Sequence, residues 1–315
     1  MSKPVRFGIQ TPQQHTTWQE LRDTWKLIDE LAYDTAWTFD HFFPIMSDPT
    51  GPCFEGWMLL AALAAEAPRV KVGVLVTGNT YRHPAVLAKM GATLDHTTDG
   101  RSIMGLGAAW FEMEHDAYGI PFYNVAERIR RSDEAAEVIK RLWTERQVTF
   151  EGDYYQLKDA YCEPKPVQKP RPPIMMGGSG EKLMLRVVAK HADQWNTFGP
   201  PPLFRHKLNV LGEHCAAVGR NLDEIEVSWA GFMLVTDSKD EKEAAVRRMA
   251  EAFGQPPENV EPALLVGSSA EIRDRIHAYV ETGVTHFIGI ASAPFNHDSL
   301  RRFAEEVIPE FRSQF

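Results

Sequence analysis

The amino-acid sequence predicts a single-domain α/β protein built as a (β/α)₈ TIM barrel with insertions. Short β-rich runs alternate with longer helical patterns along the chain, and eight such strands can be counted. A chain of 315 residues with 43% hydrophobic residues is long enough to bury one large core. We therefore expect residues 1–315 to form one barrel domain.

The first half of the chain supplies four strand and helix pairs. In the first helix, Leu21, Trp25 and Ile28 recur at helical spacing, and a later helix begins at Pro84, a residue favoured at the first helical position. The expected strands are Val5–Gln10, Ala36–Asp40, Lys71–Val76 and Arg101–Leu106. The expected helices are Trp18–Tyr33, Trp57–Glu66, the one beginning at Pro84, and Arg128–Trp143.

The second half continues the alternation after a probable hairpin over Val148–Leu157. A charged, helical insertion is expected over Asp237–Val266. Ser268 and Glu271 have the spacing of a capping box, and Gly283 stops the helix that follows. The expected strands are Ile174–Met176, Asp193–Thr197, Glu226–Leu234 and His286–Ile290, with helices over Glu181–His191 and Leu203–Val218.

A doubly wound open sheet is the competing fold. It would normally place a G-x-G-x-x-G turn after its first strand, but the segment that begins at Gly8 has no such turn. The later pair Gly105 and Gly107 is followed by Trp110 where a dinucleotide fingerprint needs its last glycine. The sequence therefore favours the barrel and argues against a Rossmann nicotinamide site.

Composition narrows the class of partner. The formal net charge of −9 argues against a general nucleic-acid or anionic-membrane surface. The three cysteines are too few and too scattered for a disulfide framework or paired metal sites, and the histidines show no recognised metal spacing. With neither an apolar leader nor a membrane-length apolar run, the sequence predicts a soluble cytoplasmic protein without a metal.

Reactive groups of a barrel gather where its strands end, on the C-terminal face. The loop Gly177–Gly180 lies between an apolar strand and a predicted helix, so its free N–H groups and the helix N-terminus could hold a phosphate. Lys182 and Arg186 could add positive charge. An isolated Gly-rich turn is more often plain structure, but its place after the fifth barrel strand favours phosphate binding.

Asp40 and His41 form the only adjacent acid and histidine pair at a predicted strand end. One residue could hydrogen-bond a cofactor ring and the other could exchange a proton near neutral pH. Asp40 could equally cap the loop while His41 packs against Phe42, and composition alone leaves both readings open.

Small and aromatic residues suggest a pocket for a flat ring. Gly107, Ala108 and Ala109 would let the backbone approach such a ring closely. Aromatic residues concentrate in or near the same loops, at Phe42, Phe43, Trp57, Trp110, Phe111, Trp195 and Phe198.

Together these segments resemble the luciferase-like monooxygenase family, particularly its F420-dependent oxidoreductase branch. The resemblance spans nearly the whole chain. It rests on Asp40–Phe42, Thr77–Asp95, Gly100-Arg101, Gly105–Glu112, Tyr118–Pro121, Glu127-Arg128, Val148–Tyr155, Pro164–Gln168, Pro173–Gly178 and His191–Asn196.

The resemblance implies a bacterial-luciferase-like barrel with the cofactor on its C-terminal face, and relatives are commonly homodimers. The phosphate would lie at Gly177, Gly178 and Ser179. Relatives often have a cis peptide and a bulge behind the ring, which would fall at Val76 and Thr77, near Asn79 at the end of the third strand. Asp40 and His41 match the pair that faces the ring, and Gly107 and Ala108 match the ring contact of the fourth strand.

One departure bears on the substrate. The sugar-phosphate dehydrogenase branch has an active-site glutamate at the position of Ala108. We therefore expect a less polar substrate or an electron-poor alkene, ketone or imine.

The leading hypothesis is hydride transfer at C5 of F420, with Asp40 orienting the ring and His41 exchanging a proton. The alternatives are an FMN-dependent monooxygenase that uses O₂ and a non-catalytic flavin-binding protein.

Overall fold

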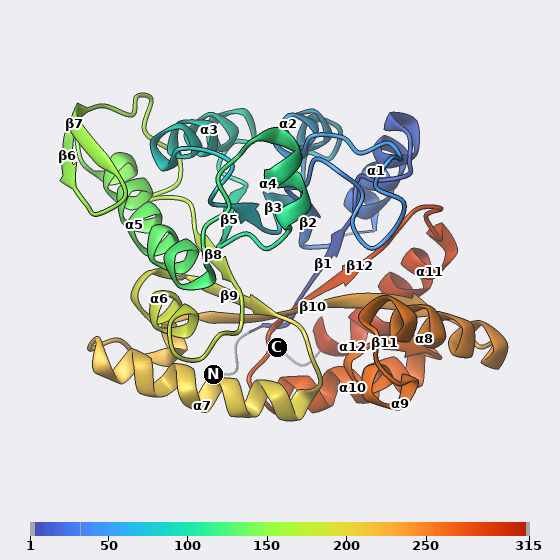
Figure 1. Ribbon diagram of the computed structural model, residues 1–315. Coiled ribbons are helices and arrows are strands. Elements are labelled where there is room, and N and C mark those ends of the chain that lie inside the picture. Colours follow the sequence, from blue (N-terminus) through green and yellow to red (C-terminus); the bar gives the residue numbers. More distant parts are fainter. Residues whose placement is uncertain (1–3, 32, 313–315) are drawn as a thin grey trace.

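The protein is a closed parallel barrel surrounded by helices, as seen in a computed structural model that describes residues 4–31 and 33–312 (Figure 1). The remaining residues of the expected domain, including Ala32 of the first expected helix, lie outside the described ranges. The strand order is β1, β2, β3, β5, β8, β9, β10 and β12, and β12 pairs with β1 to close the ring. The predicted (β/α)₈ architecture is confirmed.

The barrel strands follow the prediction closely. They are β1 (Arg6–Gln10), β2 (Thr35–Thr38), β3 (Lys71–Val74) continued by β4 (Thr77–Gly78), β5 (Ser102–Gly107), β8 (Ile174–Gly177), β9 (Gln194–Thr197), β10 (Glu226–Val235) and β12 (His286–Ile290). The predicted hairpin is β6 (Val148–Glu151) and β7 (Gln156–Ala160), an antiparallel pair outside the barrel.

Helices cover the outside of the barrel. They are α1 (Trp18–Glu30), α2 (Gly56–Glu66), α3 (Pro84–Thr97), α4 (Glu112–Tyr118), α5 (Val125–Thr144), α6 (Met184–His191), α7 (Pro201–Ala217), α8 (Lys239–Phe253), α9 (Pro257–Val260), α10 (Ser269–Val280), α11 (His297–Arg302) and α12 (Ile308–Arg312). Short turns of helix are η1 (Leu222–Glu224), η2 (Glu261–Ala263) and η3 (Phe303–Val307). Among the described residues, no helix is long and apolar enough to cross a bilayer.

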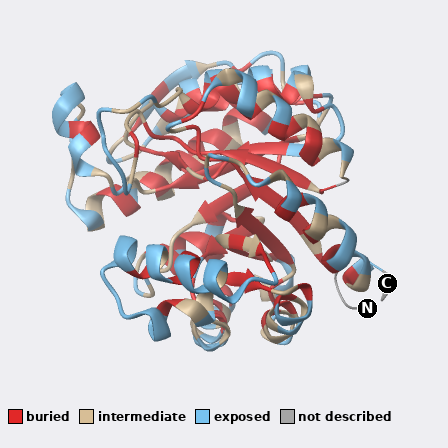
Figure 2. Cartoon of the chain, turned by 90° about the vertical axis from the view of Figure 1, so that its right-hand side faces the viewer, coloured by how far each residue is buried: buried red, intermediate tan, exposed pale blue. Residues whose placement is uncertain are grey.

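The core has two layers. Inside the barrel, six buried side chains pack together: Trp37, Leu75, Ile103, Met175, Ala230 and Ile288. A larger cluster fills the space between strands and helices and includes the fully buried Trp25, Trp143 and Trp229. Figure 2 shows the strands almost wholly buried, with exposed residues on the outer faces of the helices. The barrel is thus a filled core, and ligands have access only at its ends.

Several elements differ from the prediction, which also contained no helix after the last strand, where α11, η3 and α12 lie. The segment before Arg128 contains α4, a helix of seven residues that the sequence analysis did not predict. The end of the expected helical insertion is a strand, β11 (Leu265–Gly267), which pairs with the last three residues of β10. α6 begins at Met184 instead of Glu181. Each difference concerns a short segment, in which too few residues repeat to reveal a period.

The capping box before α10 is confirmed. The Ser268 hydroxyl accepts a hydrogen bond from the Glu271 N–H, and the Glu271 carboxylate accepts one from the Ser268 N–H at 2.9 Å. Gly283, predicted to stop this helix, has a φ of +105° three residues past its end.

Candidate active site

Asp40 lies just past β2 and is buried inside the mouth of the barrel. Its carboxylate accepts two hydrogen bonds from the Arg82 guanidinium, at 2.6 and 2.9 Å, and one from the Gly78 N–H at 3.0 Å. Arg82 also contacts Glu55, at 2.7 Å. Burial raises the pKa of Asp40, and the bonds from Arg82 oppose that shift. Arg82, which sits beside the site, is therefore already neutralised by two carboxylates.

His41 follows directly and has a partner that the sequence analysis did not identify. Its Nδ1 lies 3.0 Å from Oε2 of Glu114, which comes from α4. The rings of Phe39, Trp110 and Phe111 lie around the imidazole at 5.0, 5.5 and 5.7 Å. The side chain keeps 11% of its area exposed, so His41 forms part of the barrel mouth.

Glu114 is fully buried and receives four hydrogen-bond contacts. Oε1 accepts from the N–H groups of Phe42 and Phe43, at 2.5 and 2.8 Å, and Oε2 contacts His41 and the Tyr81 hydroxyl, at 3.0 and 2.5 Å. Burial alone would raise the Glu114 pKa, but its contacts with His41, Tyr81 and Phe43 outweigh burial and lower it. Helix α4 thus places an ionised carboxylate next to Nδ1 of His41.

Two sequence features could have revealed α4. Glu112 and Glu114 stand in its first turn, where negative charge favours a helix. Gly119 ends it with a φ of +66°, the left-handed conformation that glycine adopts readily.

The expected bulge lies between β3 and β4. The peptide bond between Leu75 and Val76 is cis. Residues 74–76 lie opposite only two residues of β5, 104–105, so the strand carries one extra residue. The irregular backbone therefore occurs where the resemblance implied that it would back the cofactor ring.

Gly107 and Gly177 both lie close to the side chain of Val76. A Cβ at Gly107 would lie 2.6 Å from Cγ2 of Val76, and one at Gly177 would lie 3.0 Å from the same atom. The two glycines therefore make room for the Val76 side chain. Ala108, next to Gly107, is half-buried and brings no acid to the mouth.

Thr77 and Asn79 are buried directly after this bulge. The Thr77 hydroxyl accepts a hydrogen bond from the Trp57 indole at 3.1 Å. Asn79 donates its N–H to the Gly107 carbonyl at 3.0 Å and its amide nitrogen to the Tyr155 hydroxyl at 3.1 Å. Its Oδ1 is buried and has no hydrogen-bond partner among the described residues. That oxygen is a free acceptor at the end of β4.

The loop Gly177–Gly180 forms an open turn at the end of β8. Gly178 has a φ of +132° and donates its N–H to the Asn196 carbonyl at 3.1 Å. Within the described chain, the N–H groups of Ser179 and Gly180 have no partner, and α6 has no side-chain cap. Unpaired amides before an uncapped helix suit an anion such as a phosphate. Lys182 and Arg186, nearby, are exposed.

The predicted aromatic cluster divides into two groups. Trp57 and Trp195 are buried in the core, at 5% and 0% exposure, so their expected place around an open pocket is wrong. Trp110 and Phe198 are 57% and 64% exposed, and they follow β5 and β9. Apolar surface at the mouth therefore comes from loops, whereas the tryptophan on β9 belongs to the core.

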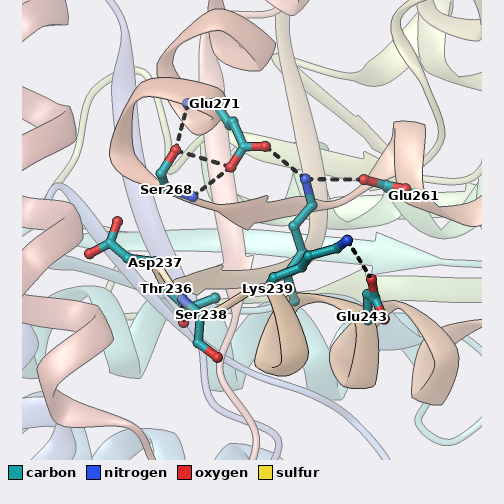
Figure 3. A pocket seen from close by; sticks show the side chains of 9 residues that line it. Thr236, Asp237, Ser238, Lys239, Glu243, Glu261, Ser268 and Glu271 are labelled. Carbon is teal, nitrogen blue, oxygen red and sulfur yellow. Dashed lines mark hydrogen bonds and ion pairs between the residues drawn. The ribbon is translucent and has the colours of Figure 1, made fainter.

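A hollow elsewhere, at the starts of α8 and α10, has the wrong chemistry for this site. Its volume is about 540 Å³, and its lining is polar and charged (Figure 3). Lys242 bonds to Glu261 and Glu271, and Lys239 contacts Glu243. The lysines of this hollow are thus already paired with carboxylates. The hollow lies outside the barrel, near the end of β10 that pairs with β11.

The barrel mouth therefore combines a strand-two histidine, a bulge with a cis peptide and a phosphate-type loop. The profile of the luciferase-like monooxygenase family matches residues 4–286. The chain belongs to the luciferase-like monooxygenase family. Membership confirms the resemblance seen in the sequence.

Within the luciferase-like monooxygenase family, the chain is similar to enzymes of two cofactor types. It is 29% identical over 340 aligned positions to an F420-dependent glucose-6-phosphate dehydrogenase of Microbacterium testaceum, covering 100% of both chains. It is also 29% identical over 213 positions to an FMNH2-dependent dimethylsulfone monooxygenase of Pseudomonas putida, covering 68% of this chain and 56% of that relative.

Solved structures agree on the fold. An F420-dependent secondary alcohol dehydrogenase, solved with an F420–acetone adduct, superposes with a TM-score of 0.88 at 20% identity, covering 98% of this chain and 100% of that one. A long-chain alkane monooxygenase superposes with a TM-score of 0.82 at 17% identity, covering 100% of this chain and 92% of that one.

Proposed function

We propose that the protein is an F420-dependent oxidoreductase that moves a hydride between the deazaflavin and a small organic substrate. The observation that carries this proposal is the end-to-end similarity to F420-dependent glucose-6-phosphate dehydrogenases, which covers the whole chain. The similarity to the FMNH2-dependent relative covers 68% of it. An FMN-dependent monooxygenase is the second candidate, favoured by that relative.

The residues at the mouth fit such a cofactor. The unpaired N–H groups of Ser179 and Gly180 would hold a phosphate, with Gly177 and Gly178 forming the turn. Val76 would support the ring, and the free Oδ1 of Asn79 would accept a hydrogen bond from the ligand. Bound F420 would supply hydride exchange at its C5 atom.

Asp40 and His41 would have separate roles beside the cofactor. Both oxygens of Asp40 already accept hydrogen bonds from Arg82 or from the Gly78 N–H. We therefore propose that Asp40 orients the ring indirectly, by holding the backbone at Gly78. His41 would exchange the proton that accompanies hydride transfer, with Trp110 shielding it from water.

The substrate is proposed to be less polar than a sugar phosphate. Ala108 occupies the position of the glutamate found in the sugar-phosphate branch, and Trp110 exposes its ring beside His41. Arg82 is paired with two carboxylates and has less charge to offer a phosphate. We expect an alcohol, ketone, imine or electron-poor alkene.

The protein purified from a host that makes F420 tests the cofactor directly. The proposal predicts a copurifying deazaflavin, identified by its absorbance and mass. A copurifying FMN from the same host would instead support the monooxygenase. A homodimer is expected on the family resemblance, and light scattering of the purified protein would measure its mass.

A further inference from the structure

We propose that Glu114 is a positioning residue that fixes the tautomer of His41, so that Nδ1 carries the proton and Nε2 faces the reaction. The tautomer of His41 is a property of the protein without any ligand. The effect of that tautomer on catalysis rests on the proposed function, so the tautomer assignment and the proposed function can be tested separately.

The Glu114 carboxylate has no proton to give. All four of its contacts run to groups that can donate: two backbone N–H groups on Oε1, and the Tyr81 hydroxyl and His41 on Oε2. Apart from His41, two backbone N–H groups, which can only donate, and the Tyr81 hydroxyl bond to the carboxylate and stabilise its ionised form. The pKa of Glu114 is accordingly lowered despite burial, so the carboxylate can only accept. The His41 nitrogen that contacts it must therefore be the donor.

The other ring nitrogen is left free. A neutral imidazole carries one proton, so Nδ1–H leaves Nε2 as a bare acceptor. Within the described residues Nε2 has no hydrogen-bond partner, and the rings of Phe39, Trp110 and Phe111 enclose the imidazole. Nε2 is then the atom that takes or returns the proton accompanying hydride transfer, and Glu114 stabilises the imidazolium in between.

Three neighbouring donors fix the carboxylate so that it cannot turn away. Phe42 and Phe43, directly after His41, donate their N–H groups to Oε1, and Tyr81 donates to Oε2 from the segment after β4. The same carboxylate thus holds both the loop that bears His41 and the ring itself. A side chain that merely filled space would need none of these contacts.

Glu114→Gln tests the inference at nearly constant shape. The position of Oε1 faces two N–H donors, so the glutamine carbonyl must occupy it, and the amide nitrogen must take the position of Oε2. That nitrogen donates to Nδ1 of His41, which must then accept and move its proton to Nε2. The variant should therefore invert the tautomer. Tyr81→Phe keeps the carboxylate and should retain the original tautomer.

Long-range proton–nitrogen NMR of the ¹⁵N-labelled full chain reads the tautomer directly. Spectra are recorded without cofactor, at a pH where the ring is neutral, and His41 is assigned from the signals missing in His41→Gln. We expect a protonated Nδ1 in the wild type and in Tyr81→Phe, and a protonated Nε2 in Glu114→Gln. A protonated Nε2 in the wild type would overturn the inference, even if no variant folds.

Kinetics test the consequence. With a turned-over substrate, Glu114→Gln should lower kcat by about 10²-fold or more, within the range of a displaced proton-transfer group, while Kd for F420 changes by less than about threefold. An inverted tautomer with unchanged kcat would show that Glu114 does not act on the reaction. An inverted tautomer in a protein that binds no F420 would instead reject the proposed function and leave the tautomer assignment standing.

Discussion

In the proposed function, His41 is the residue on which the chemistry depends most directly. It is half-enclosed by aromatic rings and held from behind by Glu114, whereas its neighbour Asp40 is occupied by Arg82 and Gly78. We therefore propose separate tasks for these adjacent residues, proton exchange for His41 and holding the backbone for Asp40. A sequence motif names both residues but does not show this division.

Replacing His41 by alanine should lower turnover far more than cofactor binding. A positioned proton-transfer group typically contributes about 10²–10⁴-fold in rate, and the ring of His41 lies 5.5 Å from that of the exposed Trp110. Steady-state kinetics measures kcat, and fluorescence titration measures Kd for F420, which should change by less than about threefold. An unchanged kcat would make His41 a packing residue.

Ser179→Asp should weaken cofactor binding through charge. The unpaired N–H groups of Ser179 and Gly180 can hold an anion, and a carboxylate there would repel a phosphate and occupy the amides itself. We expect Kd to rise roughly tenfold or more, equivalent to about 1.4 kcal/mol. Ser179→Asn, of equal size and without charge, is the matched control. Equal affinities of the two variants would place the phosphate elsewhere.

Sequence reasoning found the residues of the site better than their partners. Asp40, His41 and Gly177–Ser179 follow strand ends, and a parallel barrel brings all strand ends to one face. Glu114 lies 73 residues from His41, and its meeting with that histidine depends on how a short helix docks. The role of Gly107 beside Val76 depends likewise on close packing that no local pattern encodes.

At the scale of elements, capping and charge define where helices begin. α10 begins with a reciprocal capping box at Ser268 and Glu271, which their spacing of three residues predicted. Lys242 of α8 contacts the same glutamate at 2.8 Å, so this carboxylate also links two helices (Figure 3). By contrast, β11 has only three residues, and its pairing with β10 comes from tertiary contact.

Glu271→Gln should lower stability in a pH-dependent way. Hydrogen bonds from Lys242 and from the Ser268 N–H hold the pKa of Glu271 at about 2, below its usual 4.5. Because the folded-state pKa is the lower one, the ionised form stabilises the fold above about pH 4.5, and this contribution is lost as the pH falls toward 2.

Denaturant unfolding of both proteins measures this contribution. Glu271 is half exposed, so we expect a loss of only about 0.5–1 kcal/mol at pH 7. The difference should narrow as the pH falls below about 4.5. Glu243→Gln, which removes a more exposed contact on α8, is the control and should change stability less. A loss that is independent of pH would contradict the assignment.

At the scale of the whole molecule, the barrel was the most predictable feature. Eight largely apolar strands separated by helices leave few other ways to bury both faces of a parallel sheet. The shape of the pocket was the least predictable feature. It depends on loops, such as the one after β5 that carries Trp110 and the one after β9 that carries Phe198, and loops have no periodic pattern in the sequence. That is why the fold identifies the family more firmly than the substrate.

Cofactor choice is the central claim, and parallel titrations of the cofactor-free protein with F420 and FMN test it most directly. Both cofactors carry a phosphate for the Ser179 loop, but F420 also carries a polyglutamate tail, and Lys182 and Arg186 lie exposed beside that loop. The account predicts tighter binding of F420, weakening with added salt as the tail charges are screened, and no substrate-dependent consumption of O₂. Tighter binding of FMN together with O₂ consumption would contradict it.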